Sequence, residues 1–126
     1  MKIDRFVARV GVVAIACAAG TVWFGWLSVA CVGFVYGALE WRVTARGSIA
    51  ALGAVLAWAG TLGAELARGA DIRLVAAQIG AVMHVPGALL MVVTLVFGAL
   101  LAGTAAVLGA GITAAATRFT APSGAA

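Results

Sequence analysis

The sequence predicts an all-α membrane protein with four transmembrane helices and one amphipathic helix that lies in the membrane interface. Composition, the spacing of the charged residues and the hydrophobic periodicity predict this fold. Of the 126 residues, 65% are hydrophobic and 10% are charged, whereas soluble domains are roughly half apolar and a quarter charged. A soluble fold of this size would lack the polar side chains to cover its surface. The lipid bilayer is therefore the expected solvent.

The charged residues fall into four clusters, which divide the chain into its expected crossings. The clusters are Lys2 to Arg9, Glu40 to Arg46, Glu65 to Arg73, and Arg118. The uncharged stretches between them cover residues 10–39, 47–64 and 74–117. A helix needs about 20 residues to cross the hydrocarbon core. The middle stretch therefore predicts one crossing, at about 48–66, and the other two stretches are too long for one simple crossing.

The first long stretch divides at the motif GTVWFGW, residues 20–26. Tryptophan prefers the headgroup level, because the indole buries its rings and keeps its N–H hydrated. Trp23 and Trp26 therefore predict a helical hairpin with limbs at about 5–22 and 26–41. One alternative is a long tilted helix over 5–41, which would place these aromatic side chains in mid-membrane. A cleaved secretory signal peptide is another, although cleavage would leave a further membrane span rather than a soluble domain.

The last long stretch divides at Pro86, a residue type that is well tolerated in the first turn of a helix. Residues 71–84 before it predict a short amphipathic helix with Asp71 as its N-cap. One face carries Ile72, Val75, Ile79, Val82 and Met83, and the other carries Arg73, Ala77, Gly80 and His84. Such a helix is too short to span and is expected to lie in the interface.

The residues after Pro86 predict the fourth crossing, at about 87–112. A helix from Pro86 to Thr117 would be about 48 Å long, more than the roughly 30 Å of the hydrocarbon core. Tilt, a bend near Gly98 or Gly103, or a cytoplasmic overhang is expected to absorb the excess. Residues 119–126 are expected to form a flexible tail, so that residues 1–126 make one polytopic domain.

The distribution of basic residues predicts the orientation. Four crossings place six basic residues on one side, namely Lys2, Arg5, Arg9, Arg42, Arg46 and Arg118, and two on the other, Arg68 and Arg73. We therefore expect a multi-pass protein of the bacterial inner membrane with both termini in the cytoplasm and the amphipathic helix on the outer face. The expected interface anchors are Trp23, Trp26, Glu40, Trp41, Arg42, Glu65, Arg68 and Arg73.

Small residues recur at helical spacing in three of the expected crossings, and they predict close helix contacts. The third crossing carries a small-residue stripe formed by Ala50, Gly53, Ala57, Gly60, Ala64 and Ala67. The last crossing carries a ridge formed by Thr94, Gly98, Ala102, Ala105 and Gly109, and the second carries Gly33 and Gly37. These residues either pack the protein's own bundle or face another protein, because both contacts use the same packing physics.

Residues that could support catalysis are scarce, and the sequence predicts no enzyme. Glu40 and Glu65 end different helices on opposite sides of the predicted membrane, so they cannot act as an acid and base pair. We expect them to be ion-paired anchors, Glu40 beside Arg42 and Glu65 with Arg68 at i+3. The chain has no metal-ligand spacing, no phosphate-binding loop and no basic stripe for nucleic acid.

His84 is the single histidine of the chain and follows the amphipathic helix. We expect its side chain to meet water and lipid headgroups. The alternative is an axial ligand to a haem or a chlorophyll-type pigment, the one cofactor class that the sequence leaves open.

The order of WFGW, EWRVTARG, ALGAVLAWAG, DIRLVAAQIGAVM and a long Gly/Ala-rich last helix resembles that of small four-helix bacterial inner-membrane proteins of similar length. The function of that group is unknown, so the resemblance implies an architecture and transfers no functional residue. We expect a non-enzymatic accessory or assembly subunit that packs against a larger respiratory or photosynthetic membrane complex. Its expected partners are the lipid bilayer and other subunits or a second copy. The alternative is a small homo-oligomeric transporter or pore, in which Thr94, Thr104 or Thr113 would line a path.

Overall fold

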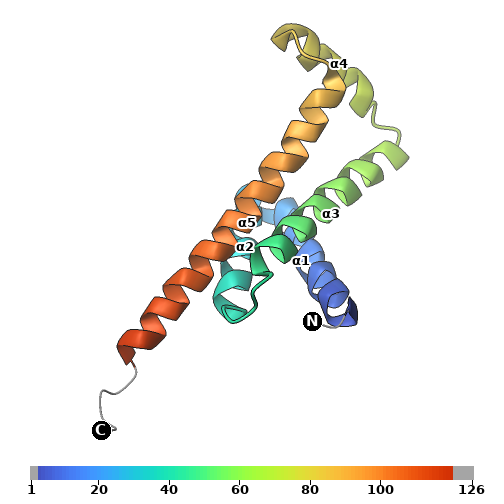
Figure 1. Ribbon diagram of the computed structural model, residues 1–126. Helices are drawn as coiled ribbons and strands as arrows, with labels where there is room; N and C mark the ends of the chain where they lie inside the picture. The colour runs from blue at the N-terminus through green and yellow to red at the C-terminus, as the bar shows by residue number, and fades with distance from the viewer. Residues whose placement is uncertain (1–2, 121–126) are drawn as a thin grey trace, which may run out of the picture.

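The computed structural model describes residues 3–120, and the regular structure in this range is entirely α-helical. The helices are α1 (Ile3–Phe24), α2 (Leu27–Leu39), α3 (Arg46–Ala67), α4 (Ile72–Met83) and α5 (Gly87–Thr120). Figure 1 shows that the start of α1, the connection between α2 and α3, and the end of α5 lie at one end of the molecule, whereas α4 lies at the other.

Three of these helices, α1, α3 and α5, are long and apolar enough to cross a membrane. The chain is therefore a helical membrane protein by the length and composition of its described helices. Helix α2 has 13 residues and is about 20 Å long, which is short of the roughly 30 Å hydrocarbon core. The predicted count of four crossings is thus not confirmed.

The turn between α1 and α2 confirms the predicted hairpin and rules out one long helix over 5–41. Gly25 has a φ of +65°, a left-handed conformation that glycine adopts without steric cost. Its N–H donates to the carbonyl oxygen of Thr21 at 3.0 Å. The hydroxyl of Ser28 donates back to the carbonyl oxygen of Gly25 at 2.7 Å, which fixes the start of α2.

Helix α5 continues past the predicted crossing at 87–112, as the expected overhang allows, and past Thr117, where the sequence analysis ended the helix. It runs without interruption for 34 residues to Thr120, which gives a length of about 51 Å, whereas the predicted crossing ends at 112. The segment from Ile112 to Thr120 contains neither glycine nor proline, so no residue there ends the helix. Residues 119 and 120, predicted to begin the flexible tail, belong to α5, and residues 121–126 lie outside the described chain.

Helix α4 confirms the predicted short helix before Pro86. A carboxylate oxygen of Asp71 accepts a hydrogen bond from the N–H of Leu74 at 3.3 Å, as expected of an N-cap. The helix packs on the start of α5 through Gly80 and Ala76, which lie against the backbone around Val85 and Gly87. Its apolar face stays largely exposed at Val75, Ile79, Val82 and Met83, and Leu74 on the other side of the helix is exposed as well.

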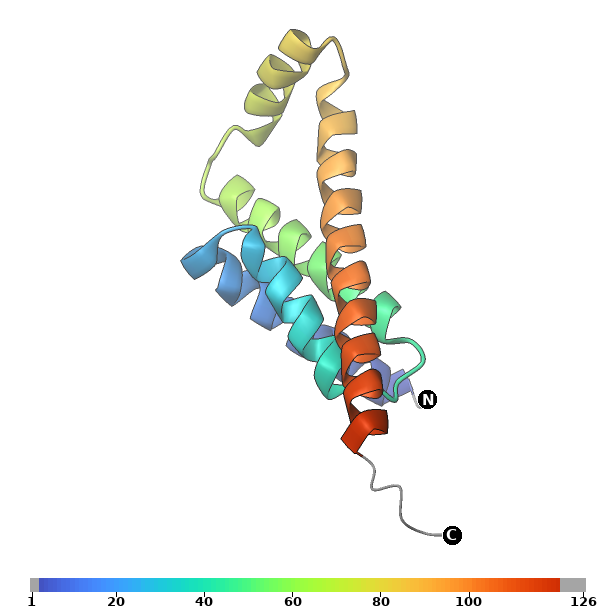
Figure 2. The same cartoon turned by 90° about the vertical axis from the view of Figure 1, so that its left-hand side faces the viewer.

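The core is built mainly from alanine and other small side chains. One cluster joins α1 to α3 and consists of Val10, Val13, Cys17, Ile49 and Ala57. The other joins α2, α3 and α5 and consists of Val29, Ala50, Ala54, Ala102 and Ala106. Most of the large apolar side chains, by contrast, are exposed, as expected of a protein whose outer surface faces lipid. Figure 2 shows α5 crossing the group formed by α1, α2 and α3.

Candidate functional site

The contact between α2 and α5 is made by residues from two of the predicted small-residue patterns, the glycine pair on α2 and the ridge on α5. A Cβ atom added to Gly33 would lie 2.6 Å from the carbonyl oxygen of Ala102. A Cβ atom at Gly37 would overlap the backbone of Ala106, and one at Gly109 would overlap the backbone around Phe34. The two helices therefore approach backbone to backbone, and the predicted residues Gly33, Gly37, Ala102 and Gly109 pack inside the chain.

The small-residue stripe on α3 is divided between the interior and the surface. Ala50, Gly53 and Ala57 are buried, and a Cβ atom at Gly53 would lie 2.6 Å from a methyl carbon of Val13 on α1. Gly60, Ala64 and Ala67 are exposed. Apart from the backbone of its own turn of helix and its two chain neighbours, no described residue has an atom within 4 Å of the Cβ position of Gly60. The first half of the stripe thus holds α1 against α3, and the second half is uncovered.

The uncovered half of the stripe lines a groove that α1 completes. The groove has a volume of about 370 Å³, and its walls include Ala14 and Ala18 from α1 and Gly60 and Ala64 from α3. Small side chains on both walls leave the helix backbones accessible to a neighbouring helix. We call this feature the α1/α3 groove.

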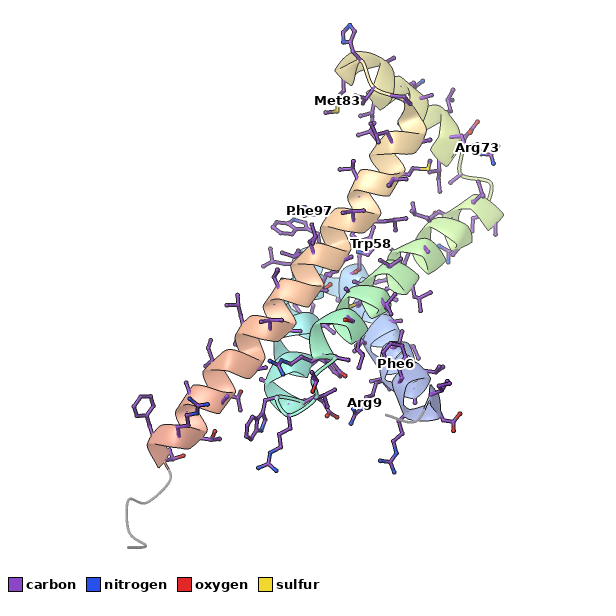
Figure 3. All side chains as sticks on the ribbon, viewed as in Figure 1. Phe6, Arg9, Trp58, Arg73, Met83 and Phe97 are labelled. Carbon is purple, nitrogen blue, oxygen red and sulfur yellow. The ribbon has the colours of Figure 1, made fainter. Side chains whose placement is uncertain are left out.

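The ridge predicted on α5 is only partly used as a packing surface. Gly98 lies under the indole of Trp58, because a Cβ atom there would be 3.7 Å from two ring atoms. Thr94 is exposed, and its hydroxyl donates to the carbonyl oxygen of Leu90. Figure 3 shows Trp58 on α3 and Phe97 on α5, which line the same small cavity beside Gly98.

The sequence pattern missed two packing residues of α5, Ala106 and Ala110, which are both buried. Gly98, Ala102, Ala106 and Ala110 recur every four residues, and this spacing could have identified the two buried alanines. The same segment is rich in small residues, so the predicted ridge with Ala105, which uses spacings of three and four, fits it equally well. Ala105 is half-buried instead.

The predicted pairing of Glu40 with Arg42 is wrong. A guanidinium nitrogen of Arg9 lies 3.1 Å from a carboxylate oxygen of Glu40, so the ion pair joins α1 to the end of α2. The guanidinium of Arg42 instead lies over the ring of Trp41, 4.8 Å from its centroid. Arg46 donates to the carbonyl oxygens of Trp41 and Val43 at 3.1 Å each, which closes the loop before α3. Figure 3 shows Arg9 at the end of α1 near the N-terminus.

The other predicted anchors lie at helix ends. The predicted Glu65 to Arg68 pair is confirmed at 2.8 Å. Trp23 and Trp26 are exposed on the two sides of the turn at Gly25, and Arg73 is exposed in the first turn of α4. These positions suit amphipathic side chains at a boundary between lipid and water.

His84 caps the end of α4 in a left-handed conformation with a φ of 56°, and it is exposed. Within residues 3–120, no three His, Cys, Asp or Glu side chains lie close enough together to hold a metal ion. A role of His84 toward a haem or a pigment stays a prediction.

None of the protein-family models, curated proteins and solved structures that were compared with the chain matches it. The resemblance to small bacterial inner-membrane proteins therefore stays an expectation from the sequence. The candidate functional site is the α1/α3 groove, together with the charged end of the α1 and α2 hairpin.

Proposed function

We propose that this protein is a non-enzymatic accessory or assembly subunit that packs against a larger membrane complex, respiratory or photosynthetic, in the bacterial inner membrane. In this proposal α1, α2, α3 and α5 cross the membrane, α4 lies on the outer face, and both termini are cytoplasmic. The partner is an apolar transmembrane helix of another subunit, which occupies the α1/α3 groove.

The hairpin geometry supports the proposed orientation. Because Arg9 pairs with Glu40, the end of α2 lies beside the first part of α1. The basic residues of the α2 to α3 loop, Arg42 and Arg46, then lie on the same side as those of α1, as the positive-inside rule favours. A 13-residue helix can cross where the bilayer thins or where flanking charged side chains reach the interface.

The uncovered half of the small-residue stripe is the observation that carries the proposed role. Lipid chains solvate a helix about as well as leucine side chains do, so association in a membrane depends on close backbone approach. The small residues of α2 and the first half of the stripe are already used inside the chain. Gly60 and Ala64, facing Ala14 and Ala18 across the α1/α3 groove, keep a flat surface for a further helix.

The threonines of α5 favour this role over the alternative of a homo-oligomeric pore. Thr94, Thr104 and Thr113 fall at about 0°, 280° and 100° around the helix, so they do not share one face. Each hydroxyl donates to a carbonyl oxygen one turn earlier in its own helix. A polar path would need such groups along one side.

Co-purification of groove variants tests the proposal. The tagged protein would be extracted from native membranes in mild detergent, separated by size and analysed by mass spectrometry. We expect it to travel at a fixed ratio with a larger complex, and Gly60→Leu to abolish this by filling the groove. Gly111→Leu is the matched control, because Gly111 is also an exposed helical glycine whose Cβ position has open space among the described residues.

Two outcomes would overturn the proposal. One is a wild-type protein that migrates alone as two to six copies, which would place the transporter or pore first. The other is a fixed-ratio complex that both leucine variants keep, which would show that the partner does not use the α1/α3 groove. Gly53→Leu serves as a folding reference, because its side chain would collide with Val13 inside the chain.

A further inference from the structure

A groove on the surface of the hairpin formed by α1 and α2 changes from charged to apolar along its length. We propose that it binds one zwitterionic phospholipid with a primary ammonium headgroup, of the phosphatidylethanolamine type. The headgroup lies at Arg9 and Glu40, and one acyl chain lies along the apolar part between α1 and α2. We call it the hairpin groove; it is separate from the α1/α3 groove of the proposed function.

The hairpin groove consists of two neighbouring cavities. The charged cavity has a volume of about 330 Å³ and includes Arg9, Tyr36 and Glu40 in its lining. The apolar cavity has a volume of about 340 Å³ and includes Ala16, Cys31 and Val35 in its lining. Val12, Tyr36 and Leu39 line both, so the two cavities lie next to each other along the hairpin. A phospholipid has this same order of a charged head and an apolar chain.

The charge arrangement selects the headgroup. The side chains of Arg9 and Glu40 are 31% and 35% exposed, so both can meet a ligand while they face each other. A headgroup with a phosphate and a primary ammonium complements both signs, with the phosphate at the guanidinium and the ammonium N–H groups at the carboxylate. An anionic lipid would bring its phosphate close to the Glu40 carboxylate without adding an ammonium group to pair with that carboxylate. A choline headgroup has no N–H to donate.

Tyr36 adds a polar group at the point where the two cavities meet. Its hydroxyl is buried and has no hydrogen-bond partner among residues 3–120. A buried hydroxyl without a partner is costly, most of all in a membrane, where water does not replace the missing bond. In this proposal the phenol ring, which lines the charged cavity, turns its hydroxyl toward a phosphate or glycerol-ester oxygen of the bound lipid, which supplies that acceptor.

The depth of the site agrees with a headgroup. Arg9 is six residues from the start of α1 at Ile3, about 9 Å along the helix. Glu40 directly follows α2 and precedes Trp41 and Arg42, whose stacked side chains are typical of the headgroup layer. The apolar part extends from there toward the turn at Gly25, past Ala16, Cys31 and the exposed Val35.

Lipid retention measured by native mass spectrometry tests the proposal. The full-length protein in mild detergent would be titrated with dioleoyl phosphatidylethanolamine, phosphatidylglycerol and phosphatidylcholine, each at the same concentration. We expect one phosphatidylethanolamine to be retained about tenfold more than either other lipid, the effect of one charge-assisted contact. We expect Glu40→Gln to remove this preference and Tyr36→Phe to weaken retention of all three lipids.

Glu65→Gln is the matched control, because Glu65 is also paired with an arginine, at the far end of α3. It should leave the lipid preference unchanged. Equal retention of the three lipids by the wild type would overturn the proposal, and so would a loss of preference in Glu65→Gln equal to that in Glu40→Gln. If Glu40→Gln does not fold, Tyr36→Phe decides, since wild-type retention of phosphatidylethanolamine in that variant would show that the hairpin groove is not the site. These readouts do not depend on whether a partner subunit exists.

Discussion

The guanidinium of Arg9 and the carboxylate of Glu40 lie 3.1 Å apart, although 31 positions separate the two residues in the sequence. Their contact fixes the register of the α1 and α2 hairpin at the end opposite to the turn at Gly25. It also places the acidic end of α2 beside Arg9 of α1. The ion pair supports the proposed orientation, and the proposed lipid site is built around it.

A double-mutant cycle at Arg9 and Glu40 measures the contribution of the pair. Each alanine substitution alone should destabilise the protein, and the double substitution should cost less than the sum of the two. Because both side chains are about one-third exposed, we expect a coupling energy of about 0.5 to 1 kcal/mol. Unfolding in detergent with tryptophan fluorescence gives the free energies. A coupling near zero would mean that the pair does not fix the hairpin.

Gly37→Ala should separate α2 from α5, because its methyl group would occupy the position of the Ala106 backbone. We expect a loss of about 1 to 3 kcal/mol, typical of overpacking. Gly111→Ala is the control, since the Cβ position there is open among the described residues; alanine is the better helix former and should be neutral or slightly stabilising. Detergent unfolding of both variants checks this. Equal stability would show that α2 and α5 are not in backbone contact.

His84→Gly should stabilise the connection between α4 and α5, because His84 has a positive φ of 56°. A left-handed backbone costs a non-glycine residue about 1 kcal/mol. Hydrogen exchange at residues 80–87 should therefore slow in this variant, whereas His84→Ala, which keeps a Cβ atom, should show no such gain. Faster exchange in His84→Gly would point to a contact of the imidazole that holds the turn.

An absorbance scan of the purified wild type tests the haem or pigment alternative, which a colourless protein would contradict.

Cysteine accessibility should reveal the proposed orientation. In a background with Cys17→Ala and Cys31→Ala, a membrane-impermeant maleimide should label Gln78→Cys in intact spheroplasts and Thr44→Cys only after lysis. Both native side chains are exposed, so either cysteine can react once the reagent reaches it. Labelling of both in intact spheroplasts would mean that α3 does not cross between them. The reverse pattern would place the termini outside.

Much of the secondary structure could be predicted from local signals in the sequence. The tryptophans and glycines at 20–26 marked a turn, and Gly25 does take the positive φ that the turn requires. Asp71 and Pro86 bracketed α4 correctly, because capping and proline geometry act within a few residues. The length of α2 was overestimated, since Glu40 and Trp41 continue the pattern of the segment while the backbone already leaves the helix at Glu40.

The candidate site was predictable only in part. Every predicted small residue lies on a helix, but the sequence could not say that Ala57 would be buried and Gly60 exposed on the same stripe. That division depends on where α1 diverges from α3. The partner of Glu40 was also missed, because a pattern within one segment favours its neighbour Arg42 over an arginine on another helix.

The sequence by itself determined the solvent of this protein, the positions of its helices and the turns that separate them. Those properties follow from composition, hydrophobic runs and capping residues, all of which act locally. Tertiary structure decided which small residues meet, which stay uncovered and which charges pair. Small side chains fit equally well against many neighbours, so their contacts are set by the crossing of whole helices rather than by any single residue.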